Sequence, residues 1–83
     1  MKFIISPVAT EKAVSGIERE NRMTFLVIRE ATKPAVKREV EEDYKEKVEK
    51  VTIMISPKNA KKAFVKFKRA GAAADLAAKL KVI

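Results

Sequence analysis

The residues of this chain best suited to bind a ligand are lysines that surround a phenylalanine in its last third. If residues 61–68 form a strand, Phe64, Lys66 and Lys68 lie on the same face of it, because side chains alternate along a strand. Lysines can neutralise phosphates, and an aromatic ring beside them offers a surface on which a nucleobase stacks. The spacing therefore favours nucleic acid as the partner.

Two other interpretations of these residues stay open. Lysines also protect an exposed edge strand from pairing with other chains, which would account for Lys66 and Lys68. In the second alternative, Phe64 is an outward-facing aromatic that the last helix covers.

The distribution of charge supports the nucleic-acid interpretation. The chain has 19 Lys and Arg against 11 Asp and Glu, a net charge of +8. Residues 1–32 carry a net +1 and residues 33–49 a net −1, so residues 50–83, with Asp75 as their single acid, carry +8. Like charges on one surface weaken the folded state, whereas a polyanion is attracted by them.

The composition argues against an enzyme. The chain has no His, no Cys and two Gly, which removes the usual zinc ligands and any glycine-rich phosphate loop. The carboxylates of Glu41, Glu42, Asp43 and Glu49 fall on a face expected in solvent, where Glu41 and Lys45 have the spacing of an ion pair. We expect no catalytic residue, no metal and no cofactor.

The length predicts one domain, residues 1–83, with a thin core. No apolar run approaches the roughly 20 residues that span a bilayer, and the apolar run at the start is too short for a signal peptide. The lack of Cys fits a reducing compartment, and the expected location is cytoplasmic.

Periodicity and capping residues predict seven elements. Thr10 and Thr32 are suited to cap helices, and Pro34 falls in a first turn, where its missing N–H costs nothing. In chain order, we expect a brief strand at 3–5, a helix from Thr10 to about 21, a strand at 22–29, a helix at 32–44, a strand at 48–56, a turn at 57–60, a strand at 61–68 and a helix at 72–80. These elements indicate an α+β domain of order β-α-β-α-β-β-α, with a four-stranded, mainly antiparallel sheet packed with helices.

Alternation predicts which strand residues face the core. The strand at 22–29 is apolar on both faces, which indicates an interior strand covered at least in part on both sides. In that strand Met23, Phe25 and Val27 point one way, and Thr24, Leu26 and Ile28 the other. The expected inward residues of the next two strands are Val51, Ile53, Ile55, Ala63, Val65 and Phe67.

Five short motifs cover nearly the whole chain. They are P-x-x-T/S-E-K within residues 7–13, N-x-x-T/V-F at 21–25, A-T-K at 31–33, V-x-x-V at 48–51 and K-K-A-Y/F-V within 61–66. Together, and in this order, they resemble motifs of the ribosomal protein L23 family of the large subunit. Phe64 stands where Tyr is common and Phe67 where Leu is usual. The short turn at 57–60 resembles the archaeal and eukaryotic type, because bacterial members carry a long basic loop there that reaches the exit tunnel.

The resemblance implies a structural protein that binds large-subunit rRNA near the polypeptide exit tunnel and helps to form a docking site for nascent-chain factors. It implies as partners the rRNA, the neighbouring ribosomal protein L29, and the signal recognition particle or other nascent-chain factors. Glu11 is the expected factor contact, and Lys12 serves the rRNA or the same docking surface. The residues expected to bind RNA are Thr10, Lys12, Arg22, Lys33, Lys37, Lys50, Lys58, Lys61, Lys62, Phe64, Lys66 and Lys68.

Two alternative functions stay open at this point. A non-ribosomal basic nucleic-acid-binding protein, such as a small chromatin protein, would bind duplex DNA as well as it binds RNA. A protein-interaction module would use the acidic helix at 39–46 and an exposed face of the sheet, and it would show no salt-dependent binding to RNA at all.

Overall fold

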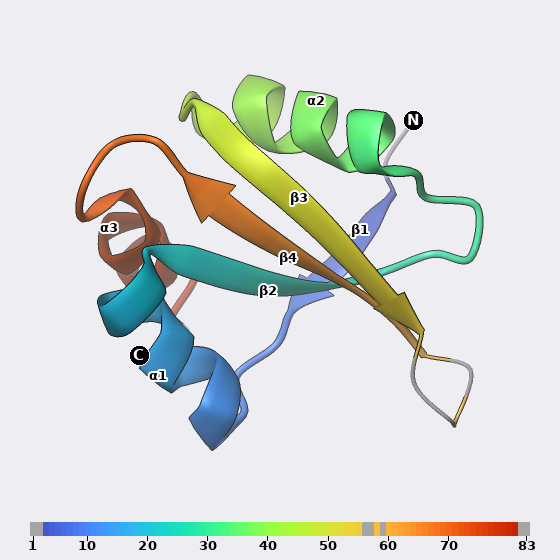
Figure 1. Cartoon of the computed structure of the whole chain (residues 1–83), viewed down its shortest axis with the longest axis horizontal. Coiled ribbons are helices and arrows are strands. Elements are labelled where there is room, and N and C mark those ends of the chain that lie inside the picture. Colours follow the sequence, from blue (N-terminus) through green and yellow to red (C-terminus); the bar gives the residue numbers. More distant parts are fainter. Residues whose placement is uncertain (1–2, 56–57, 59, 82–83) are drawn as a thin grey trace.

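The computed structural model describes residues 3–55, 58 and 60–81. The elements are β1 (Ile4–Pro7), α1 (Glu11–Glu20), β2 (Arg22–Val27), α2 (Lys33–Tyr44), β3 (Val48–Ile55), β4 (Lys61–Phe67) and α3 (Ala72–Lys79), as Figure 1 shows. The predicted α+β order is confirmed. No helix in the described part of the chain is long and apolar enough to cross a membrane.

The first two helices begin at the capping residues that the sequence indicates. The Thr10 hydroxyl accepts a hydrogen bond from the backbone N–H of Ala13 at 3.2 Å, and the Thr32 hydroxyl accepts one from Ala35 at 3.3 Å. Each bond satisfies a donor of the first turn that has no partner within its helix. α3 begins differently, after Gly71 at a φ of 81°, a conformation that glycine adopts without steric cost.

The strands form one sheet of order β1-β2-β4-β3, and all three pairings are antiparallel. β4 is therefore an interior strand, hydrogen-bonded to β2 on one side and to β3 on the other. The interpretation of residues 61–68 as a lysine-protected edge strand is wrong. β4 is the last strand in the sequence, but in the sheet it lies between β2 and β3, which both precede it in the chain.

The core lies between one face of the sheet and helices α2 and α3. The inward residues of β2 and β4 are buried there, and Leu76 and Ala77 of α3 pack against them. α2 packs mainly on β3, whereas α1 packs on β2 and on α3 at one end of the sheet. The side chains of Phe25 and Tyr44 stack in this core, with ring centroids 6.1 Å apart.

The ends of several strands differ from the predicted ones. β1 includes Pro7, which an edge strand tolerates. β2 ends at Val27. A turn follows directly, closed by a hydrogen bond from the N–H of Ala31 to the carbonyl of Ile28. Ser56, Pro57 and Asn59, assigned by sequence to the end of β3 and to the turn, lie outside the described residues.

Fewer of the inward-facing residues of β3 are buried than predicted. Val51 is buried and Ile53 is half-buried, but 65% of Ile55 is exposed. Ile55 belongs to the last pair of the β3–β4 ladder, and Figure 1 shows that these strands run past the helices at that end. The prediction that Ile55 is buried is wrong because no helix covers it there.

Candidate nucleic-acid interface

The face of the sheet opposite the core carries nine side chains in three rows across β2, β4 and β3. The rows follow from the strand register: Arg22, Lys66 and Lys50; Thr24, Phe64 and Thr52; Leu26, Lys62 and Met54. Phe64 is at the centre, between two threonines, and a lysine lies on each side of it along β4. This array places one aromatic ring within a frame of cations.

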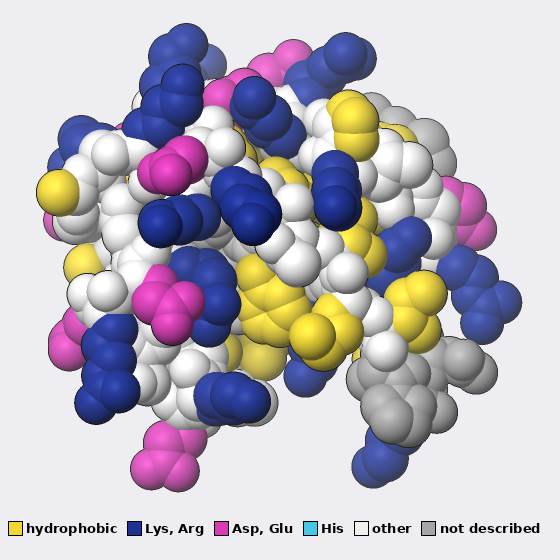
Figure 2. Space-filling model, viewed as in Figure 1, with side chains coloured by type: hydrophobic (Ala, Val, Ile, Leu, Met, Phe, Trp, Pro, Cys, Tyr) yellow, Lys and Arg dark blue, Asp and Glu magenta, His cyan; other side chains and the backbone are white. Residues whose placement is uncertain are grey.

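Helix α1 and the segment before it close one side of this face into a groove of about 560 Å³. In Figure 2, dark blue Lys and Arg side chains surround a hydrophobic centre over β2 and β4. The described lining residues are Val8, Thr10, Lys12, Ala13, Glu20, Arg22, Thr24, Lys50, Thr52, Met54, Lys62, Phe64 and Lys66. Five of them are basic and one is acidic, so the groove attracts anions.

Arg22 lies across the Phe64 ring at the end of the groove nearest α1. Its guanidinium carbon is 5.1 Å from the ring centroid, within the range of a cation–π contact. Glu20 holds the same guanidinium through an ion pair of 2.9 Å. Gly16 makes room for it, because a Cβ at that position would come within 3.1 Å of the Arg22 Nη2. Gly16 and Glu20 of the preceding helix and Phe64 of β4 thus set the position of Arg22.

The last helix does not cover Phe64. The buried residues of α3 join the core beside Val65 and Phe67, whose side chains point away from that of Phe64. Phe64 is half-buried, and the described residues that line its groove come from α1, the segment before α1, and strands β2, β3 and β4. The interpretation of Phe64 as an aromatic beneath α3 is wrong, because α3 packs on the opposite face.

The groove brings together seven of the twelve residues predicted to bind RNA, from Thr10 at its rim to Lys66 on β4. Lys33 and Lys37 are exposed on α2, and Lys58 and Lys68 are exposed on either side of β4, so these four lie elsewhere. The Lys61 side chain is directed toward the loop before α2, where its ammonium donates to the carbonyls of Arg29 at 2.9 Å and Ala31 at 2.7 Å. Two of its three donors therefore stabilise the loop before α2.

Sequence reasoning did not assign six of the groove residues to the site: Val8, Ala13, Glu20, Thr24, Thr52 and Met54. Alternation already separated Thr24, Thr52 and Met54 from the core face. Their place beside Phe64 depends on strand register, which no local pattern encodes. Ala13 and Glu20 join the groove only because α1 packs against β2.

Comparison with known proteins identifies the family. The family model described as Ribosomal protein L23 matches residues 2–79. The chain belongs to the ribosomal protein L23 family. It is similar to the large ribosomal subunit protein uL23 of Picrophilus torridus, with 55% identity over 65 residues, which are 78% of this chain and 78% of that protein. The resemblance drawn from five short motifs is confirmed.

Membership of the L23 family makes the chain a structural constituent of the large ribosomal subunit. It is accordingly a ribosome-associated protein of the cytoplasm and a component of the translation machinery. The family is one of structural proteins and not of enzymes. Among the described residues, no group of three or more His, Cys, Asp or Glu side chains is placed to hold a metal ion.

A second hollow of about 360 Å³ lies on the other side of Arg22, along α1. It is lined by Glu11, Lys12, Ser15, Gly16, Arg19, Glu20 and Arg22. Glu11, which the sequence comparison above led us to expect as a factor contact, is exposed and does not line the groove. Lys12, Glu20 and Arg22 line both hollows and therefore form the border between them.

The acidic segment at 39–46 is partly engaged inside the fold. Glu39 is buried, and its carboxylate accepts hydrogen bonds from the backbone N–H groups of Phe3 and Ile4. The Glu41 carboxylate accepts one from the N–H of Val48 at 3.0 Å, where the sequence had suggested an ion pair with Lys45. Both carboxylates therefore tie α2 to neighbouring strands.

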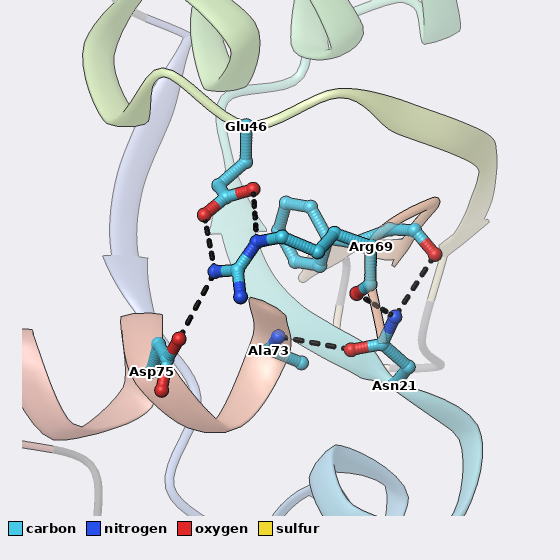
Figure 3. A network of polar contacts seen from close by, with 6 residues as sticks. Asn21, Glu46, Arg69, Ala73 and Asp75 are labelled. Atoms are coloured by element: carbon cyan, nitrogen blue, oxygen red, sulfur yellow. Dashed lines mark hydrogen bonds and ion pairs between the residues drawn. The ribbon is translucent and has the colours of Figure 1, made fainter. Parts of the chain in front are cut away.

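Glu46, just after α2, is bound by Arg69, which lies between β4 and α3. The Arg69 guanidinium donates to both Glu46 oxygens, at 3.2 and 2.6 Å, and to Asp75 at 3.0 Å, as Figure 3 shows. The hydrogen bonds from Arg69 lower the pKa of Glu46, and those to Glu46 and Asp75 raise the pKa of Arg69. The acidic face required by a protein-interaction module is reduced by these internal bonds.

Proposed function

We propose that this member of the L23 family binds large-subunit rRNA near the polypeptide exit tunnel, through the groove of β2, β3 and β4. The observation that carries the proposal is the position of Phe64, an aromatic ring in the middle of five basic side chains. These basic side chains attract the phosphates of RNA, and binding of the phosphates releases counterions from the RNA. Lys33, Lys37, Lys58, Lys61 and Lys68 lie outside the groove and stay predicted RNA contacts.

Binding to fragments that tile the large-subunit rRNA, over a series of salt concentrations and with duplex DNA as competitor, tests this proposal. We expect saturable binding to one fragment that survives the competitor. Changing Lys50, Lys62 and Lys66 together to Gln removes about three phosphate contacts, so the negative slope of log affinity against log salt should become shallower by roughly 2 to 3.

A matched control removes the same charge at exposed positions outside both the groove and the predicted RNA contacts, by changing Lys45, Lys47 and Lys79 to Gln. We expect the groove variant to lose much more affinity than this control. Equal losses would mean that the protein is attracted by its net charge and that the groove is not the site. Equal affinity for duplex DNA and for every RNA fragment would contradict specific rRNA binding.

We also propose that the outer face of α1 helps to form a docking site for nascent-chain factors, with Glu11 as a contact and Lys12 at its border. The similarity of residues 7–13 to the opening motif of the family supports this role, as does the exposure of Glu11 outside the groove. The signal recognition particle is the factor to test first, and ribosomal protein L29 is the proposed neighbour on the ribosome.

Ribosomes that carry the Glu11→Ala variant should bind the signal recognition particle more weakly in a cosedimentation assay. The isolated variant should keep its affinity for the rRNA fragment, because Glu11 lies outside the groove. Glu18→Ala is the control, since Glu18 is exposed on the same helix and lines neither hollow. Loss of rRNA binding in the Glu11 variant would overturn the role assigned here.

A further inference from the structure

We infer that the groove takes a single unpaired nucleotide of the RNA, whose base stacks on Phe64. This inference rests on the proposed function and narrows it from RNA in general to an unpaired position, such as a bulge or a loop. It is carried by the shape of the site, by the neighbours of the ring and by the arrangement of the surrounding charges.

The ring is placed to receive a base. Phe64 is paired across the strands with Thr24 and Thr52, two side chains too short to cover the face of its ring. Arg22 covers part of it through the cation–π contact and adds a planar guanidinium beside it. Since Phe64 is half-buried, part of its ring surface is accessible within the groove.

Cations flank the ring on both sides along β4. Lys62 and Lys66 lie two residues before and two residues after Phe64 on the same face of β4, about 13 Å apart along the strand. Lysine side chains are long and flexible, so both ammonium groups can reach the phosphates on the two sides of a stacked base. Lys50 lies in the same row as Lys66 and adds a third cation at that end.

A base-paired helix does not fit these features. Bases in a duplex are stacked on each other and present only their edges, so a duplex would leave the face of the Phe64 ring unused. The groove of about 560 Å³ is instead in the size range of sites that hold one small ligand, roughly 300 to 1,000 Å³. Stacking on an aromatic ring is tolerant of base identity, so the site distinguishes unpaired from paired nucleotides.

The chain has no tryptophan, so one Phe64→Trp substitution creates a fluorophore at the site itself. We expect the fluorescence of this variant to be quenched by single-stranded oligoadenylate and by the tightest-binding rRNA fragment. A blunt RNA duplex of the same length, at matched occupancy, should quench it much less. Ile5→Trp is the control, because Ile5 is 59% exposed on β1 and outside the groove, and its fluorescence should not respond.

The Phe64→Leu variant provides a second readout. It should bind the rRNA fragment at least about fivefold more weakly, because an apolar side chain remains but the stacking surface is lost. Its salt dependence should not change, since the phosphate contacts of the lysines remain. Phe64→Tyr keeps the ring and should keep the affinity. Thermal unfolding of each variant shows whether the domain is intact.

The outcomes separate this inference from the proposed function. If the rRNA fragment binds with the lysine-dependent salt slope but does not quench Phe64→Trp beyond the control, the unpaired-nucleotide site is wrong and the proposed function stands. Equal quenching by the duplex would also overturn the inference. If no RNA binds the intact protein in a salt-dependent way, the proposed function itself fails.

Discussion

The side-chain oxygen of Asn21, at the end of α1, accepts a hydrogen bond of 3.0 Å from the backbone N–H of Ala73, in the first turn of α3. The amide nitrogen of the same side chain donates to the carbonyls of Phe67 at 3.0 Å and Arg69 at 2.7 Å (Figure 3). Asn21 also has a φ of 53°, in the left-handed region, where Asn is tolerated better than most residues. One residue thus joins the ends of α1 and β4 to the start of α3.

Replacing Asn21 with Ala should lower the free energy of unfolding by about 2 to 4 kcal/mol. The substitution removes three hydrogen bonds to backbone groups and places a Cβ without a compensating polar group in the left-handed region. Asn21→Gly loses the same bonds without the strain and should be about 1 kcal/mol less damaging. Urea unfolding measures both, and equal losses would show that the backbone conformation contributes nothing.

Replacing Lys45 with Gly should raise the free energy of unfolding by about 0.5 to 1 kcal/mol. Lys45 ends α2 with a φ of 59°, a conformation that costs a lysine more than a glycine. Its side chain is exposed, so little packing is lost. Lys47→Gly is the matched control: Lys47 does not have a positive φ, so glycine there should destabilise the fold through its greater freedom in the unfolded chain. A loss of stability in the Lys45 variant would contradict the prediction.

The ion pair between Glu46 and Arg69 should make stability fall in acid. Hydrogen bonding to Arg69 lowers the pKa of Glu46 in the folded state from its usual value of 4.5. The stabilisation is therefore present above the pKa of the unfolded chain and is lost as the pH falls through the lower pKa of the folded state. In urea unfolding from about pH 7 to about pH 3, the wild type should lose more stability than Glu46→Gln.

The control for this prediction removes the partner. In an Arg69→Met background, Glu46→Gln should leave the acid dependence unchanged, because the carboxylate no longer has the guanidinium that lowers its pKa. If Glu46→Gln changed the acid dependence of stability equally in both backgrounds, Arg69 would not be the group that lowers the pKa of Glu46. Both side chains are solvent-accessible, so the difference should shrink at high salt.

Replacing Glu39 with Ala should destabilise the domain by about 2 to 3 kcal/mol. The buried carboxylate accepts from the N–H groups of Phe3 and Ile4, and its removal leaves two partly buried donors without a partner. Glu39→Gln keeps one acceptor oxygen and the side-chain volume and should lose less. Chemical denaturation measures both variants, and equal stability of the Ala variant and the wild type would show that solvent replaces the carboxylate.

The helix starts were predictable because capping is local. Thr10 and Thr32 bond N–H groups three residues away, so the pattern that predicts the helix contains both partners. The faces of β2 and β4 were predictable for the same reason, because alternation along one strand separates Phe25 from Thr24. Ile55 was assigned wrongly because alternation states which way a side chain points and not what covers it.

The sequence by itself determined the order of the elements, the basic character of the last third and the family to which the chain belongs. These depend on residue types and on spacings within one segment. Only the tertiary structure decided that β4 lies between β2 and β3, that Phe64 stands between two threonines, and that the Lys61 ammonium binds the loop before α2. These relations are made by hydrogen bonds and packing between segments far apart in the chain, and a local pattern holds only one partner of each such pair.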